Sequence, residues 1–274
     1  MITTQIDSFG RMYTLTGAEI GEFESLKLFI EEEEKFILKI KKEYKLEVRE
    51  DLLVLFVQLY VLRFAIPYYQ MLHNEFPGST HIVFLRKILY TCLIGRFIDD
   101  LIDKDSEMFK TYESILLFQK YYQKLSDLLT NEDKIKFDSY LFDSTVYKSP
   151  VIKSKLTFNH IRTDIYERIK YFFVESEKFS RQMQELLKSY VCVLLANLDI
   201  SDLIADGYLK NSSTVISNYA YKKFYNDEKK LLLDQKLLHF YTEMKTVLLT
   251  ENKTIIDYCY ANQLHYTANI LKKA

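Results

Sequence analysis

The scarcity of helix-breaking residues is the strongest constraint on what this chain can fold into. Only 6 glycines and 3 prolines occur among 274 residues. Sheet-rich folds and dinucleotide-binding folds need many tight turns, where glycine and proline are the usual residues. Hydrophobic residues make up 48% of the chain and charged residues 27%, a balance that excludes an intrinsically disordered chain. We therefore expect a folded, nearly all-helical protein.

Apolar residues recur with the 3.6-residue period of a helix in about ten segments. The expected helices cover residues 18–44, 50–74 with a kink at Pro67, 80–103, 113–129, 132–142, 151–174, 180–206, 213–224, 227–249 and 254–272. No internal repeat, low-complexity linker or shift in composition separates these segments. The sequence therefore predicts a single all-α domain over residues 1–274.

Charge and cysteine usage limit the partners and the compartment. The 37 basic and 38 acidic side chains give a net charge of -1, whereas nucleic-acid binding requires a basic excess, so we expect no nucleic-acid partner. Cys92, Cys192 and Cys259 lack the spacing of a disulfide framework or a metal site, which favours a reducing compartment. The apolar runs are too short to span a bilayer, and residues 1–16 lack a signal-peptide pattern. We expect a cytoplasmic protein with no membrane span.

Three carboxylates follow an apolar helical segment at residues 99–103. Asp99 and Asp103 are four residues apart and Asp100 and Asp103 are three apart, so all three can face one region. Two such charges about 5 Å apart repel by roughly 3 kcal/mol at an effective dielectric near 20. The end of the helix disfavours anions further. The cluster is therefore expected to bind a cation, and because its donors are all oxygens, the expected cation is Mg²⁺. The alternative is a solvated acidic turn.

A second acidic cluster ends another apolar helical segment. At 100° per residue, Asp199, Asp202 and Asp206 fall within an arc of roughly 60°. If the two clusters face each other across a cavity, they would hold several Mg²⁺ ions that bind a diphosphate. The 22 tyrosines and 19 phenylalanines either fill a helical core or line such a cavity, and composition does not choose between the two.

The run Asp99-Asp100-Leu101-Ile102-Asp103 resembles the DDxxD motif of class I isoprenoid synthases, the superfamily of terpene cyclases and trans-prenyl diphosphate synthases. The length, helical composition and aromatic richness are similar too. The resemblance implies the isoprenoid synthase type I fold, a bundle of about ten helices around a central cavity. It also implies that three Mg²⁺ ions assist the ionisation of an allylic prenyl diphosphate. The carbocation then cyclises and diphosphate is released, which is the lyase reaction of a terpene synthase.

By this resemblance Asp99, Asp100, Asp103 and the second cluster bind metal, and arginines bind the diphosphate. Arg96 lies one turn before Asp99, and its alternative role is a salt bridge to its own neighbouring acids. Arg162 lies where cyclases place a diphosphate-sensing arginine, and its alternative is an ordinary surface position. Arg181 is a further candidate, and Phe97 is expected to contact the substrate. Among these residues, Asp99, Arg96 and Arg162 are expected to be catalytic.

The position of the second metal motif stays open among three sets. Terpene cyclases carry a motif of the type NDxxSxxxE, whereas squalene and phytoene synthases carry DxxxD, which Asp202 and Asp206 match. In order of preference, the sets are Asp199, Asp202 and Asp206, then Asn197 and Ser201, then Asn226 and Asp234.

Two other functions remain as alternatives. Head-to-head prenyl coupling, as in squalene and phytoene synthases, would use the same fold with a pocket for two prenyl chains. A non-enzymatic helical interaction protein would have solvated acidic turns. For the enzyme, the expected partner is a small prenyl diphosphate, and a homodimer is compatible with the resemblance.

Overall fold

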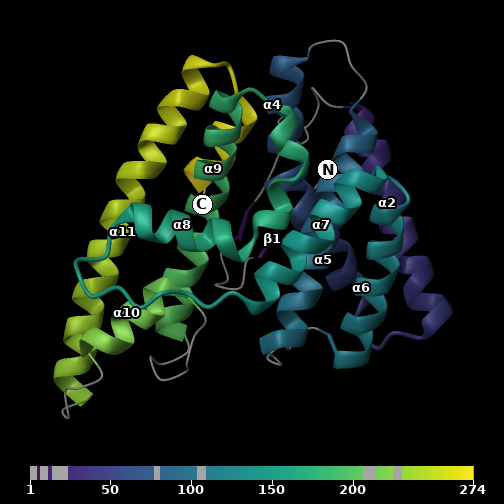
Figure 1. The fold of residues 1–274 in the computed structure, drawn as a ribbon. Coiled ribbons are helices and arrows are strands. Elements are labelled where there is room, and N and C mark those ends of the chain that lie inside the picture. The colour runs from purple at the N-terminus through teal and green to yellow at the C-terminus, as the bar shows by residue number, and fades with distance from the viewer. Residues whose placement is uncertain are drawn as a thin grey trace. The chain divides into compact units, whose positions relative to one another are not determined.

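The computed structural model describes the backbone of residues 5–6, 12–13, 24–76, 81–103, 109–205, 214–224 and 230–273. Side chains are described for residues 28–76, 81–102, 109–200, 214–220 and 238–272. One antiparallel pair, β1 (Gln5–Ile6) with β2 (Met12–Tyr13), interrupts an otherwise helical set of elements (Figure 1). The expected all-α class is thus confirmed.

The chain divides into two compact units. Unit 1 comprises Met1–Lys134 with Lys273, and unit 2 comprises Ile135–Lys272 with Ala274. Within unit 1 the helices are α2 (Glu24–Tyr44), α3 (Glu50–Tyr60), a π-helical turn η1 (Val61–Ala65), α4 (Ile66–Glu75), α5 (Ile82–Asp103) and α6 (Thr111–Ser126). The single isoprenoid synthase-like domain remains a prediction.

Helix α5 is the central element of unit 1. It packs along α6 and also contacts α3, η1 and α4. Because it has neighbours on several sides, α5 needs apolar residues on more than one face, which is what its sequence supplies. The buried side chains of this helix are Leu85, Ile88, Leu89, Tyr90, Cys92, Leu93, Ile94 and Phe97.

A buried ion pair lies in this core. The Glu33 carboxylate accepts hydrogen bonds from the Tyr90 hydroxyl at 2.6 Å and from the Lys124 ammonium at 2.8 Å. The same ammonium lies 3.6 Å from the centre of the Phe36 ring and 4.5 Å from that of Tyr90. Burial disfavours the charged amine and lowers the pKa of Lys124, although Glu33 acts in the opposite direction.

The helical run through α3, η1 and α4 contains Pro67, where the sequence predicts a kink. The structure places a π-helical turn at Val61–Ala65, just before this proline, and the Ile66 amide donates to the Val61 carbonyl five residues back. Proline has no amide hydrogen and its ring crowds the preceding turn, so a widened turn lets the helix continue past it. The run Glu50–Glu75 is long and apolar enough to cross a membrane, with a mean hydropathy of 1.7 in its most apolar window. Half of that window is buried inside the protein, and one such helix is weak evidence for a membrane span, because a core helix passes the same test. The prediction that the apolar runs are too short to span a bilayer is thus wrong for Glu50–Glu75, whereas the absence of a membrane span stays a prediction.

Unit 2 contains most of α7 (Asn131–Val146), then α8 (Phe158–Arg168), two 3₁₀ turns η2 (Lys170–Phe173) and η3 (Glu175–Lys178), α9 (Arg181–Ala205), α10 (Val215–Phe224), α11 (Lys230–Ala261) and α12 (His265–Lys273). Helix α9 contacts α8, α10 and α11. The buried core that these four helices enclose includes Ile161, Ile165, Cys192, Ala196, Ile200, Val215, Ile216, Phe240, Met244 and Leu248.

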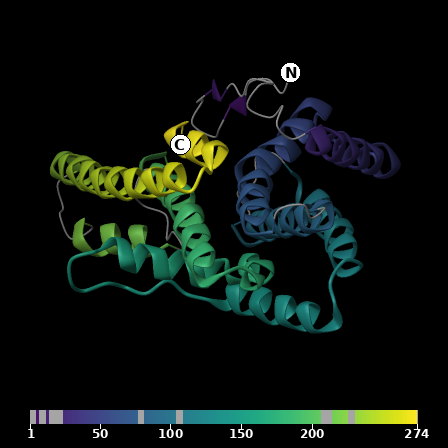
Figure 2. The same cartoon turned by 90° about the horizontal axis from the view of Figure 1, so that it is seen from above.

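The largest differences from the predicted helix boundaries lie in the expected helix 151–174 and at the expected break between 249 and 254. Residues 151–157 are not helical, and α8 begins only after Thr157, whose hydroxyl accepts the His160 amide as an N-cap. The expected break near residue 250 is absent, and α11 continues to Ala261 as one long helix (Figure 2). No glycine or proline lies in 230–261, so the chain offers no residue that would end the helix there.

Helices α2 and α11 end in the same way although neither has the usual glycine. Lys45 and Gln263 both adopt left-handed backbone conformations, with φ of 54° and 60°. In each case the next residue closes the helix end, because the Leu46 amide donates to the Lys41 carbonyl at 3.0 Å and the Leu264 amide donates to the Cys259 carbonyl at 2.8 Å. This is the hydrogen bond of a Schellman motif, and both leucines are buried beneath the helix they close.

Candidate functional site

The acidic cluster of unit 1 lies in the last turns of α5, and its two described carboxylates have opposite environments. The Asp99 side chain is 57% exposed, whereas that of Asp100 is 2% exposed. Neighbouring residues on a helix point about 100° apart, so one carboxylate faces outward while the next shares the buried face with Phe97. Asp103 is the last residue of α5, and its side chain lies outside the described residues.

Arg96 contacts both of these aspartates. Its Nη1 lies 3.3 Å from Asp99 Oδ2, and its Nη2 lies 2.5 Å from Asp100 Oδ1. Burial opposes the charge on the guanidinium, but the nearby Tyr60, Asp100 and Asp99 more than offset this, so the pKa of Arg96 is raised. Arg96 therefore offsets the expected repulsion between Asp99 and Asp100 within α5. Of the two roles considered for Arg96, the salt bridge to its own acids is the one observed.

The donor set at this helix end fits a hard divalent ion through Asp99. Its carboxylate is exposed and consists of the oxygen donors that Mg²⁺ prefers. Asp100 fits less well, because its carboxylate is buried and held by Arg96. Across the described residues, no group of three or more His, Cys, Asp or Glu side chains is arranged to hold a metal ion. The roles of Asp103 in metal binding and of a set of three Mg²⁺ ions remain predictions.

Phe97 is fully buried among the aromatic residues of unit 1. Its ring lies 5.6 Å from that of Phe56, 5.5 Å from that of Phe109 and 6.0 Å from that of Tyr121, measured between ring centres. Edge-to-face and offset stacks at these separations are typical of a packed core. Around Phe97, the aromatic residues of this chain therefore fill a core, and its contact with a substrate remains a prediction.

In unit 2 the described member of the second acidic cluster, Asp199, is tied to an arginine. Arg168 of α8 pairs with Asp199 of α9 through Nη2 and with Asp164 through Nε, the latter at 3.2 Å. The Asp199 side chain is only 11% exposed. The side chain of Asp202, on α9, and the whole of Asp206 lie outside the described residues.

Asp164 is the centre of this buried network. Its side chain is fully buried and accepts hydrogen bonds from the Tyr147 hydroxyl at 3.2 Å and from the Val215 backbone amide at 3.1 Å. Burial, and then the adjacent Asp164, raises the pKa of Tyr147 to about 12. The network thus joins α8, α9, the start of α10 and the segment after α7. Sequence reasoning missed Asp164 and Arg168, although their spacing of four residues on a helix is that of an ion pair.

Cys192 lies next to this network in the core of unit 2. Burial raises the pKa of its thiol to about 12, with smaller effects of Arg162, Asp199, Arg168 and Glu251. A thiol that stays protonated and buried is a poor nucleophile. All three cysteines are buried and free.

The remaining arginine candidates have different surroundings. Arg162 forms an ion pair with Glu185, and this guanidinium lowers the pKa of Glu185 against the raising effect of burial. Arg181 begins α9 and is exposed. The observed pairing of Arg162 lies at a partly exposed position, and a diphosphate contact for either arginine remains a prediction.

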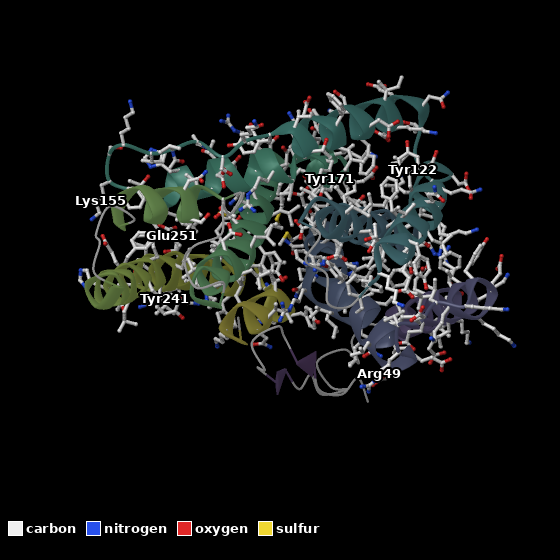
Figure 3. The ribbon with its side chains drawn as sticks, turned by 90° about the horizontal axis from the view of Figure 1, so that it is seen from below. Arg49, Tyr122, Lys155, Tyr171, Tyr241 and Glu251 are labelled. Atoms are coloured by element: carbon white, nitrogen blue, oxygen red, sulfur yellow. The ribbon has the colours of Figure 1, made fainter. Side chains whose placement is uncertain are left out.

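The alternative second motifs are described only in part. The Asn197 side-chain amide donates to the Val193 carbonyl at 3.0 Å, and its oxygen accepts from the Lys245 ammonium at 2.9 Å. The Lys245 ammonium also lies 5.7 Å from the ring centre of Tyr241. Lys245, Tyr241 and Glu251 all belong to α11, and Figure 3 labels the last two. Ser201 and Asp234 lie on helices, with side chains outside the described residues, and Asn226 lies outside them altogether.

The two acidic clusters belong to different units, because Asp99 lies in unit 1 and Asp199 in unit 2. The expectation that they face each other across a central cavity stays a prediction. Comparisons of the chain with protein-family models, with curated proteins and with solved structures find no match. The assignment to the isoprenoid synthases therefore rests on the residues quoted above.

Proposed function

We propose that the chain is a class I terpene synthase, which ionises an allylic prenyl diphosphate with the help of Mg²⁺ and cyclises the resulting carbocation. The observation that carries the proposal is the position of Asp99 in the DDxxD sequence at the end of α5. There an exposed carboxylate lies 3.3 Å from an arginine that is itself 41% exposed. An anionic metal ligand and a cationic phosphate donor are thus available side by side.

Each residue at this helix end has a distinct role in the proposal. Asp99 would hold Mg²⁺, which would supply neutralising charge for the leaving diphosphate. Arg96 would donate hydrogen bonds from its exposed edge to the phosphate oxygens, because a guanidinium matches phosphate geometry. Asp100 would act as a positioning residue, since its buried carboxylate fixes the guanidinium at 2.5 Å.

The direct test is turnover. Purified protein is incubated with geranyl, farnesyl and geranylgeranyl diphosphates and Mg²⁺, and both released pyrophosphate and the organic extract are measured. We expect a hydrocarbon or terpene alcohol from at least one donor. A product with twice the chain length would instead identify head-to-head coupling. Absence of turnover with every donor contradicts the enzyme proposal.

The site is tested with Asp99→Asn. We expect turnover to fall on the order of 10²-fold or more, because charge neutralisation of the leaving group is lost. Circular dichroism should be unchanged, since the replaced side chain is exposed. The matched control is Asp127→Asn, which alters an exposed aspartate just after α6 and should keep full activity. Equal activity of the two variants would exclude Asp99 from the site.

A non-enzymatic helical interaction protein is the second candidate. In its favour, Arg96 already pairs with both described carboxylates at the end of α5, as in a structural ion pair. In that case no donor is turned over, and Asp99→Asn changes neither binding of pyrophosphate with Mg²⁺ nor stability.

A further inference from the structure

Two histidines meet where α4 ends and α5 begins, away from the acidic end of α5. His73 lies in the last turn of α4, and His81 immediately precedes α5, where its carbonyl accepts the Leu85 amide at 2.9 Å. Their ring centres are 6.1 Å apart, with the ring planes at 78°. Two imidazoles that bind one ion at about 2.0–2.1 Å have ring centres about 5–6 Å apart. The separation of His73 and His81 is therefore close to that of two histidines that bind the same metal ion.

The His81 imidazole has an unsatisfied nitrogen. The residue is 5% exposed, and among the described residues its Nε2 is buried without a hydrogen-bond partner. A buried polar nitrogen without a partner costs free energy, which a ligand bound at that nitrogen would recover.

Both imidazoles contact the ring of the same aromatic residue. Tyr69 stacks on His73 with ring centres 5.9 Å apart and meets His81 edge-on at 5.5 Å. The three rings therefore form one cluster that brings the two imidazoles together at the end of α4 and the start of α5.

We propose that His73 and His81 form a two-histidine site for a divalent transition-metal ion such as Zn²⁺, with water completing the coordination. Imidazole ligands favour Zn²⁺, Ni²⁺ and Cu²⁺ over Mg²⁺, so the site is chemically separate from the carboxylates at the other end of α5. His73 is exposed, so solvent reaches the pair from its side. A bound ion would tie the end of α4 to the start of α5.

The test is Zn²⁺ titration by calorimetry of the full chain, purified without a polyhistidine tag and in a large excess of Mg²⁺. We expect about one ion per chain, with affinity reduced about tenfold or more in His73→Gln and in His81→Gln. His73 is exposed, so its variant keeps the test valid even where His81→Gln fails to fold. The matched control is His239→Gln, an exposed histidine on α11 in unit 2.

Three results would overturn this site. The first is the absence of saturable Zn²⁺ binding to the wild-type chain, and the second is unchanged binding in both His73→Gln and His81→Gln. The third is loss of Zn²⁺ binding in Asp99→Asn, which should bind the ion as the wild type does, because this loss would place the ion at the carboxylates instead. Zn²⁺ binding and prenyl diphosphate turnover are therefore tested by different residues, and each can fail without the other.

Discussion

Arg96 and Asp100, one helical turn apart on α5, form an ion pair in which the arginine is 41% exposed and the aspartate 2% exposed. The pair thus connects the protein interior to the surface through a single guanidinium. Removing Arg96 alone would leave the buried Asp100 carboxylate without a counter-ion.

Arg96→Met should lower the free energy of unfolding by about 2 kcal/mol, because it leaves the Asp100 carboxylate buried without a cation. The value is below that of a fully buried pair, since water already screens part of the guanidinium. Urea denaturation measures the change. Arg49→Met is the control, because both members of the Arg49–Asp51 pair are exposed to solvent, so its loss should change stability much less. A similar cost for both variants would contradict the interpretation.

Arg168→Met should destabilise unit 2 by about 3 kcal/mol, since Asp164 is fully buried and Asp199 nearly so. Adding Asp164→Leu to this variant should recover part of the loss, because the more deeply buried of the two carboxylates is then removed together with the arginine. Arg162→Met removes a partly exposed pair with Glu185 and serves as the matched control. Chemical denaturation of the wild type, Arg168→Met, Asp164→Leu and the double variant forms a cycle in which fully additive effects would refute coupling.

Stability should fall above pH 10 because three core tyrosines, Tyr68, Tyr90 and Tyr121, have raised pKa values. Burial is the main cause for each, with Cys92 adding to it for Tyr68 and Glu33 for the other two. The unfolded chain releases these protons near pH 10 while the folded chain keeps them. Each tyrosine therefore removes about 1.4 kcal/mol of stability per pH unit above 10.

Lys124 acts in the opposite direction in this range, because its lowered pKa costs stability at low pH and this cost disappears as pH rises. One lysine opposes three tyrosines, so the net slope stays negative. Urea titrations between pH 8 and 11 give the slope, and absorbance at 295 nm counts the ionised tyrosines. Tyr90→Phe should reduce the slope by about one proton, and an unchanged slope would show that Tyr90 titrates normally.

Lys45→Gly should raise the free energy of unfolding by about 0.5–1 kcal/mol. The residue has a φ of 54°, where a Cβ atom is strained and glycine is not. Thermal unfolding measures the gain. Lys42→Gly is the control three residues earlier, inside the last turn of α2, where glycine should instead cost up to about 1 kcal/mol. A loss in both variants would contradict the left-handed assignment.

Much of the helical structure follows from local patterns. The end of α5 at Asp103 and the start of α9 near Arg181 agree with the predicted helices, because apolar periodicity and the nearby breakers are local signals. The left-handed turns at Lys45 and Gln263 were not predicted, since neither position has the glycine that normally marks them. The predicted break between 249 and 254 is wrong, since no glycine or proline lies there, and the actual end of α11 at Ala261 has no glycine to mark it.

The site is less predictable than the helices. Spacing alone allowed Arg96 to bind either a phosphate or its own acids, because both roles need the arginine one turn before Asp99. Spacing did not single out Asp164 and Arg168, since what buries them is the packing of α9 and α10, far away in sequence. Periodicity describes which face of a helix is apolar, but it does not say which distant helix covers that face.

The π-helical turn at Val61–Ala65 has a consequence for how this chain tolerates insertions and deletions. A π turn holds one residue more than a regular turn, so removing one residue there would restore an unbroken α-helix. Because the π turn already takes up that residue within one turn, its removal would leave α4 close to its present orientation, with Tyr68 and Met71 still in the core. A deletion within α3 or α4 would instead rotate the helix that follows by about 100°. Val61–Ala65 is therefore the one stretch of this helical run where we expect the loss of a single residue to be tolerated.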